Sequence, residues 1–159
     1  MMGGMGGGGG QQQLQQLSQE LQAIDEEITE LEGDVDDLEQ EKNEIDEAVE
    51  AIETLETGST VQVPLGGGAY LRAEVQDIDE VIVDLGGNYA AEQESGDAID
   101  ALRTKQDALD ERIAEVEGEI SDLEDESSEL EQQAQQMQQQ MQQQQMQQMQ
   151  QMQGDEDGE

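Results

Sequence analysis

The 159-residue chain carries 42 acidic and five basic side chains and no histidine, so its formal net charge at pH 7 is −37. Double-stranded nucleic acid and anionic membranes bind proteins through cationic side chains, so this charge argues against both as partners. The chain has no cysteine for a disulfide. No apolar run approaches the roughly 20 residues of a membrane-spanning helix, and residues 1–10 lack the features of a signal peptide. We therefore expect a soluble, cytoplasmic protein.

The acidic residues are spread along the helical segments rather than gathered in one tail. One interpretation is an acidic disordered protein, but the apolar residues recur too regularly for that. Self-repulsion of this size opposes compaction in dilute buffer, whereas at about 1 M salt the screening length falls to about 3 Å. The composition therefore indicates a protein built for molar salt.

Residues 1–10 contain only Met and Gly, and we expect them to be disordered. Residues 11–57 are predicted to form the first helix of a coiled coil, because apolar residues alternate at steps of three and four. Eleven of the twelve seam positions are aliphatic, and the exception is a lysine. These positions are Leu14, Leu17, Leu21, Ile24, Ile28, Leu31, Val35, Leu38, Lys42, Ile45, Val49 and Ile52.

Residues 58–95 change to an alternation of apolar and polar positions, which predicts strands. Gly66–Gly68 and Gly86–Asn88 supply the turns of two hairpins. Because isolated hairpins are only marginally stable in water, we expect this unit to assemble with other chains. The residues predicted to mediate assembly are Val61, Val63, Leu65, Leu71, Val75, Val81, Val83 and Leu85.

Residues 96–141 are predicted to form the second helix, with a seam that matches the first in length and folds back antiparallel. Its seam positions are Ile99, Leu102, Gln106, Leu109, Ile113, Val116, Ile120, Leu123, Ser127, Leu130, Ala134, Met137 and Met141. The preferred register places Ile52 beside Ile99, Leu31 beside Ile120 and Leu14 beside Met137. A shift by one heptad creates more mismatched layers. Residues 142–159 form a Gln/Met-rich tip and an acidic tail, and composition leaves open whether the Gln/Met tract is helical or disordered.

The sequence offers little for catalysis. Without His, both the usual general base and the usual metal ligand are missing. The glycine runs match no phosphate-binding motif, and Asp77, Asp79, Glu80 and Asp84 lack the pattern of a calcium loop. We therefore expect a protein that is not an enzyme and has no cofactor and no metal.

The hairpin segment resembles that of prefoldin alpha subunits of archaea, and the acidity favours a haloarchaeal member. The resemblance rests on Val61–Leu65, on Ala69–Leu71 and on the run from Asp77 to Glu92, DIDEVIVDLGGNYAAE, together with the order helix, two hairpins, helix. It implies a mainly α fold with a small β unit, in which a long antiparallel coiled-coil hairpin is joined by two β-hairpins that oligomerise into a β-barrel. It also implies a hetero-hexamer of two alpha and four beta subunits.

The activity that the resemblance implies is ATP-independent capture of unfolded proteins at the coiled-coil tips and their delivery to a group II chaperonin. We place the client-binding site at the distal tip, where flexible Met side chains suit a promiscuous surface. The alternative is that the later Met residues belong to a disordered Gln tract. A structural coiled-coil scaffold without client binding is the competing function. The predicted tip residues are Leu14, Leu17, Met137, Met141, Met146, Met149 and Met152.

Overall fold

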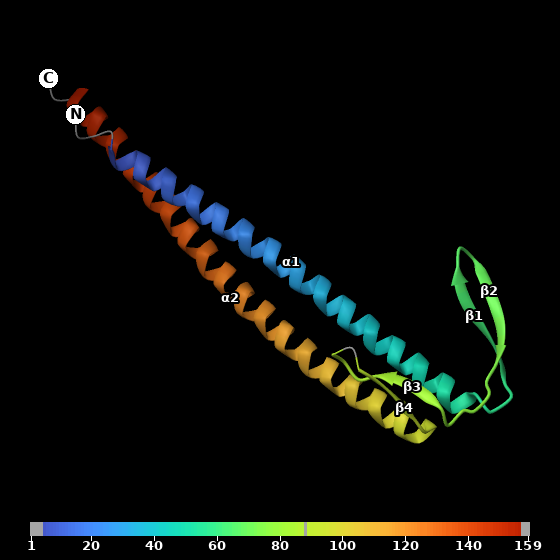
Figure 1. Cartoon of the computed structure of the whole chain (residues 1–159). Helices are drawn as coiled ribbons and strands as arrows, with labels where there is room; N and C mark the ends of the chain where they lie inside the picture. Colours follow the sequence, from blue (N-terminus) through green and yellow to red (C-terminus); the bar gives the residue numbers. More distant parts are fainter. Residues whose placement is uncertain (1–4, 88, 157–159) are drawn as a thin grey trace. The chain divides into compact units, whose positions relative to one another are not determined.

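The computed structural model describes the backbone of residues 5–87 and 89–156 and the side chains of residues 9–87 and 89–154. The chain begins with one long helix, continues through four short strands and ends with a second long helix (Figure 1). The elements in chain order are α1 (Met5–Thr54), β1 (Thr60–Gly66), β2 (Ala69–Glu74), β3 (Val81–Asp84), β4 (Ala90–Gln93) and α2 (Ser95–Glu156).

The chain divides into two compact units. The hairpin unit consists of residues 34–115 and contains all four strands. The terminal unit consists of residues 1–33 and 116–159 and, within the described range, is formed by the first part of α1 and the last part of α2. In each unit the segments of α1 and α2 run antiparallel, side by side (Figure 1).

The strands form two separate two-stranded antiparallel sheets, β1–β2 and β3–β4. In the first, Val63 pairs with Leu71, and the chain turns at Gly67 and Gly68, whose φ angles are 61° and 81°. This left-handed backbone is the one that a tight hairpin turn requires and that glycine adopts without strain. The predicted turn at Gly66–Gly68 is therefore confirmed. In the second turn Gly86 and Gly87 also have positive φ, whereas Asn88 lies outside the described residues.

The β3–β4 hairpin lies beside the start of α2 (Figure 1). The Lys105 ammonium donates a hydrogen bond to the Asp84 carbonyl oxygen at 2.8 Å. The Ser95 hydroxyl donates to Asp79 Oδ1 at 3.1 Å. Val83 is buried, at 4% exposure, as is Ala98 in the first turn of α2. The second hairpin is thus packed within its own chain, whereas β1–β2 extends away from the helices in Figure 1.

The helix seams follow the heptads predicted from the sequence. All twelve predicted positions of α1 are buried or half-buried, and those of α2 from Ile99 to Met141 are as well. The most buried seam residues are Ile45 and Val49 in the hairpin unit and Ile24 and Val116 in the terminal unit. The seam therefore serves as the aliphatic core that the composition requires.

Contacts inside each unit agree with the preferred register. In the terminal unit Gly10 lies against Met141, so closely that a Cβ added there would be 3.3 Å from the Met141 sulfur. In the hairpin unit the preferred register pairs Gln106 with Ile45. The Gln106 side chain forms hydrogen bonds with Lys42 and Asp46, which lie on either side of Ile45 in α1. The register one heptad along would separate these pairs.

The helix boundaries differ from the predicted segments at both ends. Helix α1 already includes Met5–Gly10, where we expected disorder, although each glycine costs a helix about 1 kcal/mol. At Gly10 the lack of a side chain allows close packing against α2, because a Cβ there would lie 3.3 Å from the Met141 sulfur. Helix α2 continues to Glu156, so the Gln/Met tract is helical.

Helix α1 ends at Thr54, before the predicted boundary at residue 57. Gly58 has a φ of 92°, and its amide donates to the Val75 carbonyl at 2.7 Å. The segment after the helix is therefore tied to the end of β2. In the described part of the chain, neither helix contains a stretch long and apolar enough to cross a membrane.

Candidate functional site

The first hairpin presents apolar side chains to solvent. Leu65 is 64% exposed and Leu71 is 55% exposed, and Val63, the cross-strand partner of Leu71, is 40% exposed. Tyr70, which precedes Leu71 in β2 and therefore lies on the other face of the hairpin, is 63% exposed. A two-stranded sheet also leaves the outer backbone groups of both strands unpaired. The hairpin therefore offers apolar side chains and strand edges together, as a surface that assembles with other sheet would.

The predicted assembly residues divide into two groups in the structure. Val63, Leu65, Leu71 and Leu85 are exposed, so a partner chain could reach them. Val61, Val75 and Val81 are half-buried, and Val83 is buried inside the hairpin unit. Val83 thus packs within its own chain, because the β3–β4 hairpin lies against the start of α2, which the strand pattern does not reveal.

Sequence reasoning missed three exposed apolar residues of the hairpins: Tyr70, Ile82 and Tyr89. Ile82 is 75% exposed, although it lies in a short strand next to buried Val83. The signal was present in the run Val81-Ile82-Val83, where apolar residues occupy both faces of one strand. Such a strand has an apolar face left over once the other is covered.

The acidic residues of the hairpin loops stabilise turns. Asp77 Oδ1 accepts a hydrogen bond from the Asp79 amide at 3.0 Å, and Asp84 Oδ1 accepts one from the Gly86 amide at 2.9 Å. Carboxylates commonly close turns in this way. No group of three or more acidic side chains in the described residues is arranged to hold a metal ion.

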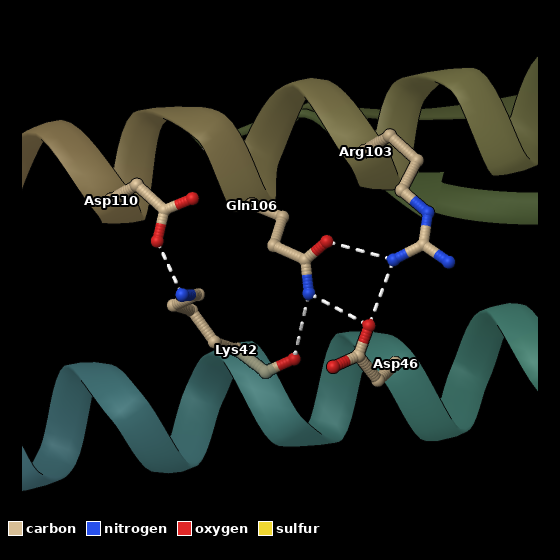
Figure 2. A network of polar contacts seen from close by, with 5 residues as sticks. All are labelled: Lys42, Asp46, Arg103, Gln106 and Asp110. Carbon is tan, nitrogen blue, oxygen red and sulfur yellow. Dashed lines mark hydrogen bonds and ion pairs between the residues drawn. The ribbon is translucent and has the colours of Figure 1, made fainter.

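A polar network replaces apolar contact at two adjacent layers of the hairpin unit (Figure 2). Gln106 of α2 donates from its amide nitrogen to the Lys42 carbonyl at 3.2 Å and to Asp46 Oδ1 at 2.9 Å. Arg103 Nη1 donates to Asp46 Oδ1 and to Gln106 Oε1, both at 2.8 Å. The Lys42 ammonium forms an ion pair with Asp110. Lys42 and Gln106, the two polar seam positions of the hairpin unit, thus find partners in each other and in flanking charged residues.

The network shifts the pKa values of Lys42 and Asp46. Hydrogen bonds from Gln106 and then Arg103 hold the pKa of the Asp46 carboxyl below its ordinary value of 3.8. The hydrogen bond to Asp110 raises the pKa of Lys42 above 10.5, and burial opposes this only in part. Both groups are therefore charged at neutral pH.

The predicted tip residues lie in the terminal unit. Leu14, Leu17, Met137 and Met141 are half-buried in the seam. Met146, Met149 and Met152 are 70%, 73% and 76% exposed on the last turns of α2. These three side chains line one shallow groove together with Gln142, Gln145 and Gln148. The structure thus separates the predicted set into seam residues and exposed methionines.

Comparisons with known proteins agree on one family. The family model for prefoldin subunits matches residues 24–151. The prefoldin alpha subunit of Halorubrum lacusprofundi is 74% identical over 63 residues, which are 40% of this chain and 41% of the relative. That of Haloarcula marismortui is 55% identical over 65 residues, 41% of this chain and 42% of the relative. The chain therefore spans about two fifths of the length of the curated relatives that it matches.

Among solved structures, the chain is similar to one described as a cryo-EM structure of filamentous PFD from Methanocaldococcus jannaschii. The identity is 24%, the TM-score is 0.48, and the match covers 76% of this chain and 96% of the other. The family match over residues 24–151 includes both hairpins and most of both helices. On that match, the chain belongs to the prefoldin family.

Proposed function

We propose that this chain is the alpha-type subunit of a prefoldin chaperone, a non-enzymatic holdase that captures unfolded proteins in the cytoplasm without ATP. The observation that carries the proposal is a family match that includes both hairpins, with an apolar hairpin surface that this single chain leaves exposed. In this proposal two alpha-type subunits assemble with four beta-type subunits, and their hairpins join in β-barrels. Captured clients are delivered to a group II chaperonin.

Assembly is tested by co-expression with the beta-type subunit of the same genome in molar KCl, followed by measurement of the assembly mass. Leu71→Asp places a charge on the exposed apolar face of β2 and should prevent the hexamer, because a buried charge without a partner is costly. Gln62→Asp adds the same charge to β1 in the adjacent cross-strand pair with Arg72, on the opposite face of the hairpin from Val63 and Leu71, and should leave assembly intact. A full-mass assembly of the Leu71→Asp variant would contradict the role given to this face.

Client capture is tested by suppression of the aggregation of a denatured protein. A chain that ends at Leu130 keeps both hairpins and should still form the hexamer, but it lacks every methionine of α2 and should hold the client more weakly. Equal protection by truncated and full-length assemblies would remove the tip from the proposal. A well-formed hexamer that protects no client would favour the alternative function of a coiled-coil scaffold.

A further inference from the structure

Every sulfur atom of the chain lies either in the first five residues or after residue 136. The chain has no cysteine, and its eight methionines are Met1, Met2, Met5, Met137, Met141, Met146, Met149 and Met152. Residues 6–136, which include β1 to β4, therefore contain no sulfur. Tryptophan and histidine are also missing from the sequence. The methionine thioethers are thus the groups of this chain that a two-electron oxidant attacks most readily.

The structure divides the five methionines of α2 into two groups. The seam methionines, Met137 and Met141, are half-buried along the line where α2 packs on α1 in the terminal unit. The groove methionines, Met146, Met149 and Met152, are 70%, 73% and 76% exposed. Because an oxidant must reach the sulfur atom to react, the groove methionines should be oxidised before the seam methionines.

Oxidation of the groove methionines would remove the apolar character of the groove. A peroxide transfers one oxygen atom to the thioether: the S–O bond forms as the O–O bond breaks, sulfur gives up two electrons, and hydrogen peroxide leaves as water. The product, methionine sulfoxide, is polar. The other residues that line the groove are Gln142, Gln145 and Gln148, so the groove methionines supply its apolar side chains. Hydrogen peroxide is uncharged, so the net charge of −37 does not repel it.

We propose that the groove methionines form a modification site for peroxides, and that their conversion to sulfoxides weakens the binding of unfolded chains at this groove. This inference rests on the proposed chaperone function and adds a means of regulating the same site. Assembly through the hairpins of this chain should not respond to peroxide, because the hairpins contain no sulfur. The change is reversible, because methionine sulfoxide reductases restore the thioether. In that step two thiols become a disulfide, and the oxygen leaves as water.

The experiment uses the assembled complex in molar KCl. The complex is treated with hydrogen peroxide, the peroxide is removed with catalase, and a denatured client is then added, so that the client itself is not oxidised. Tandem mass spectrometry follows each methionine with time, and the groove methionines should be oxidised several-fold faster than the seam methionines. Protection of the client should fall several-fold, while the assembly mass and the helical circular dichroism stay constant. Methionine sulfoxide reductases with dithiothreitol should restore the protection.

Replacement of all three groove methionines by leucine removes their sulfur and keeps apolar side chains. Whatever protection this variant gives before treatment should be unchanged by peroxide. The matched control, Met137→Leu with Met141→Leu, keeps the groove methionines and should lose the same fraction of its protection as the wild type. A persistent loss in the leucine variant of the groove would overturn the proposal, because the oxidised group would then lie elsewhere in the complex. So would seam methionines that react as fast as the groove methionines, or full protection by a complex whose groove is oxidised.

A failure of the proposed function gives a different result. An untreated complex that protects no client would contradict client capture, and with it the proposed regulation. The order in which the methionines are oxidised would still decide whether the groove is the modification site.

Discussion

The two units of the molecule build the same antiparallel helix pair from different charge patterns. All five basic residues of the chain lie in the hairpin unit, where they accompany 24 acids. The terminal unit has eighteen acids and no Lys or Arg. The two ion pairs between α1 and α2 described in the structure, Lys42–Asp110 and Arg103–Asp46, are accordingly both in the hairpin unit.

The contrast separates two ways of holding helices together. In the terminal unit the pairing depends on the aliphatic seam, at Ile24 and Val116 for example, and on salt that screens the acids from one another. In the hairpin unit Lys42 and Gln106 give up apolar contact at their layers and gain directional bonds to Asp110 and Asp46. A polar layer of this kind specifies the register of a coiled coil at a cost in stability. The hairpin unit is thus the part whose alignment is fixed by specific pairs.

The largest effect should come from removal of salt. As KCl falls from molar concentration to dilute buffer, amide hydrogen exchange should accelerate first in the terminal unit, at residues 11–33 and 116–141. It should accelerate later at residues 34–54 and 95–115, where cations offset part of the repulsion. Total helical circular dichroism should fall over the same range.

Sodium chloride at equal ionic strength is the control, because screening depends on ionic strength rather than on K⁺ itself. Exchange that rises equally in both units would show that the cross-helix pairs do not distinguish them. A melting temperature that does not change with salt concentration would contradict the interpretation of the acidity as an adaptation to salt.

The second effect concerns the network itself. Lys42→Glu replaces the partner of Asp110 by a like charge and should lower the melting temperature, more so at low salt. Glu41→Gln, at the neighbouring exposed position, is the control and should have little effect or stabilise slightly. If Lys42→Glu melts like the wild type at every salt concentration, the network does not hold the hairpin unit.

Much of this architecture could be predicted from sequence, because heptads and strand alternation are local patterns. The seam from Leu14 to Ile52, the turn at Gly66–Gly68 and the preferred register of the two helices all follow from spacing, whereas the helix at Met5–Gly10 was expected to be disordered. The burial of Val83 could not be predicted, because it depends on the hairpin folding against α2. Spacing places Lys42 and Gln106 on the seam, but the ion pair of Lys42 with Asp110 and the hydrogen bonds of Gln106 with Asp46 and Arg103 depend on side-chain rotamers that spacing does not give.

A third and smaller effect concerns the helical glycines of the terminal unit. A Cβ added at Gly33 or at Gly118 would have no atom within 4 Å, so alanine fits at both positions. Each Gly→Ala change should stabilise its helix by about 1 kcal/mol. Thermal unfolding in molar KCl measures this gain. Amide hydrogen exchange should slow mainly in the terminal unit, so the exchange rates of the two units should become more similar.

Gly10→Ala is the contrasting variant, because its Cβ would crowd the Met141 sulfur at 3.3 Å. A gain from Gly10→Ala as large as from Gly33→Ala would contradict the packing described there.

The smallest effect should be a pH dependence confined to the hairpin unit. Since Gln106 and Arg103 hold the pKa of Asp46 below 3.8, its folded pKa is lower than its unfolded one. The carboxylate therefore contributes stability above the unfolded value and loses it as the pH falls through the folded value. The difference in the free energy of unfolding between the wild type and Asp46→Asn should be constant near neutrality and should shrink as the pH falls below about 4.

Acidification also neutralises many other acids and relieves repulsion in both proteins alike, so only this difference isolates the contribution of Asp46. A gap for Asp46→Asn that is as wide at about pH 3 as at neutrality would mean that the bonds to Gln106 and Arg103 do not depend on the charge of Asp46.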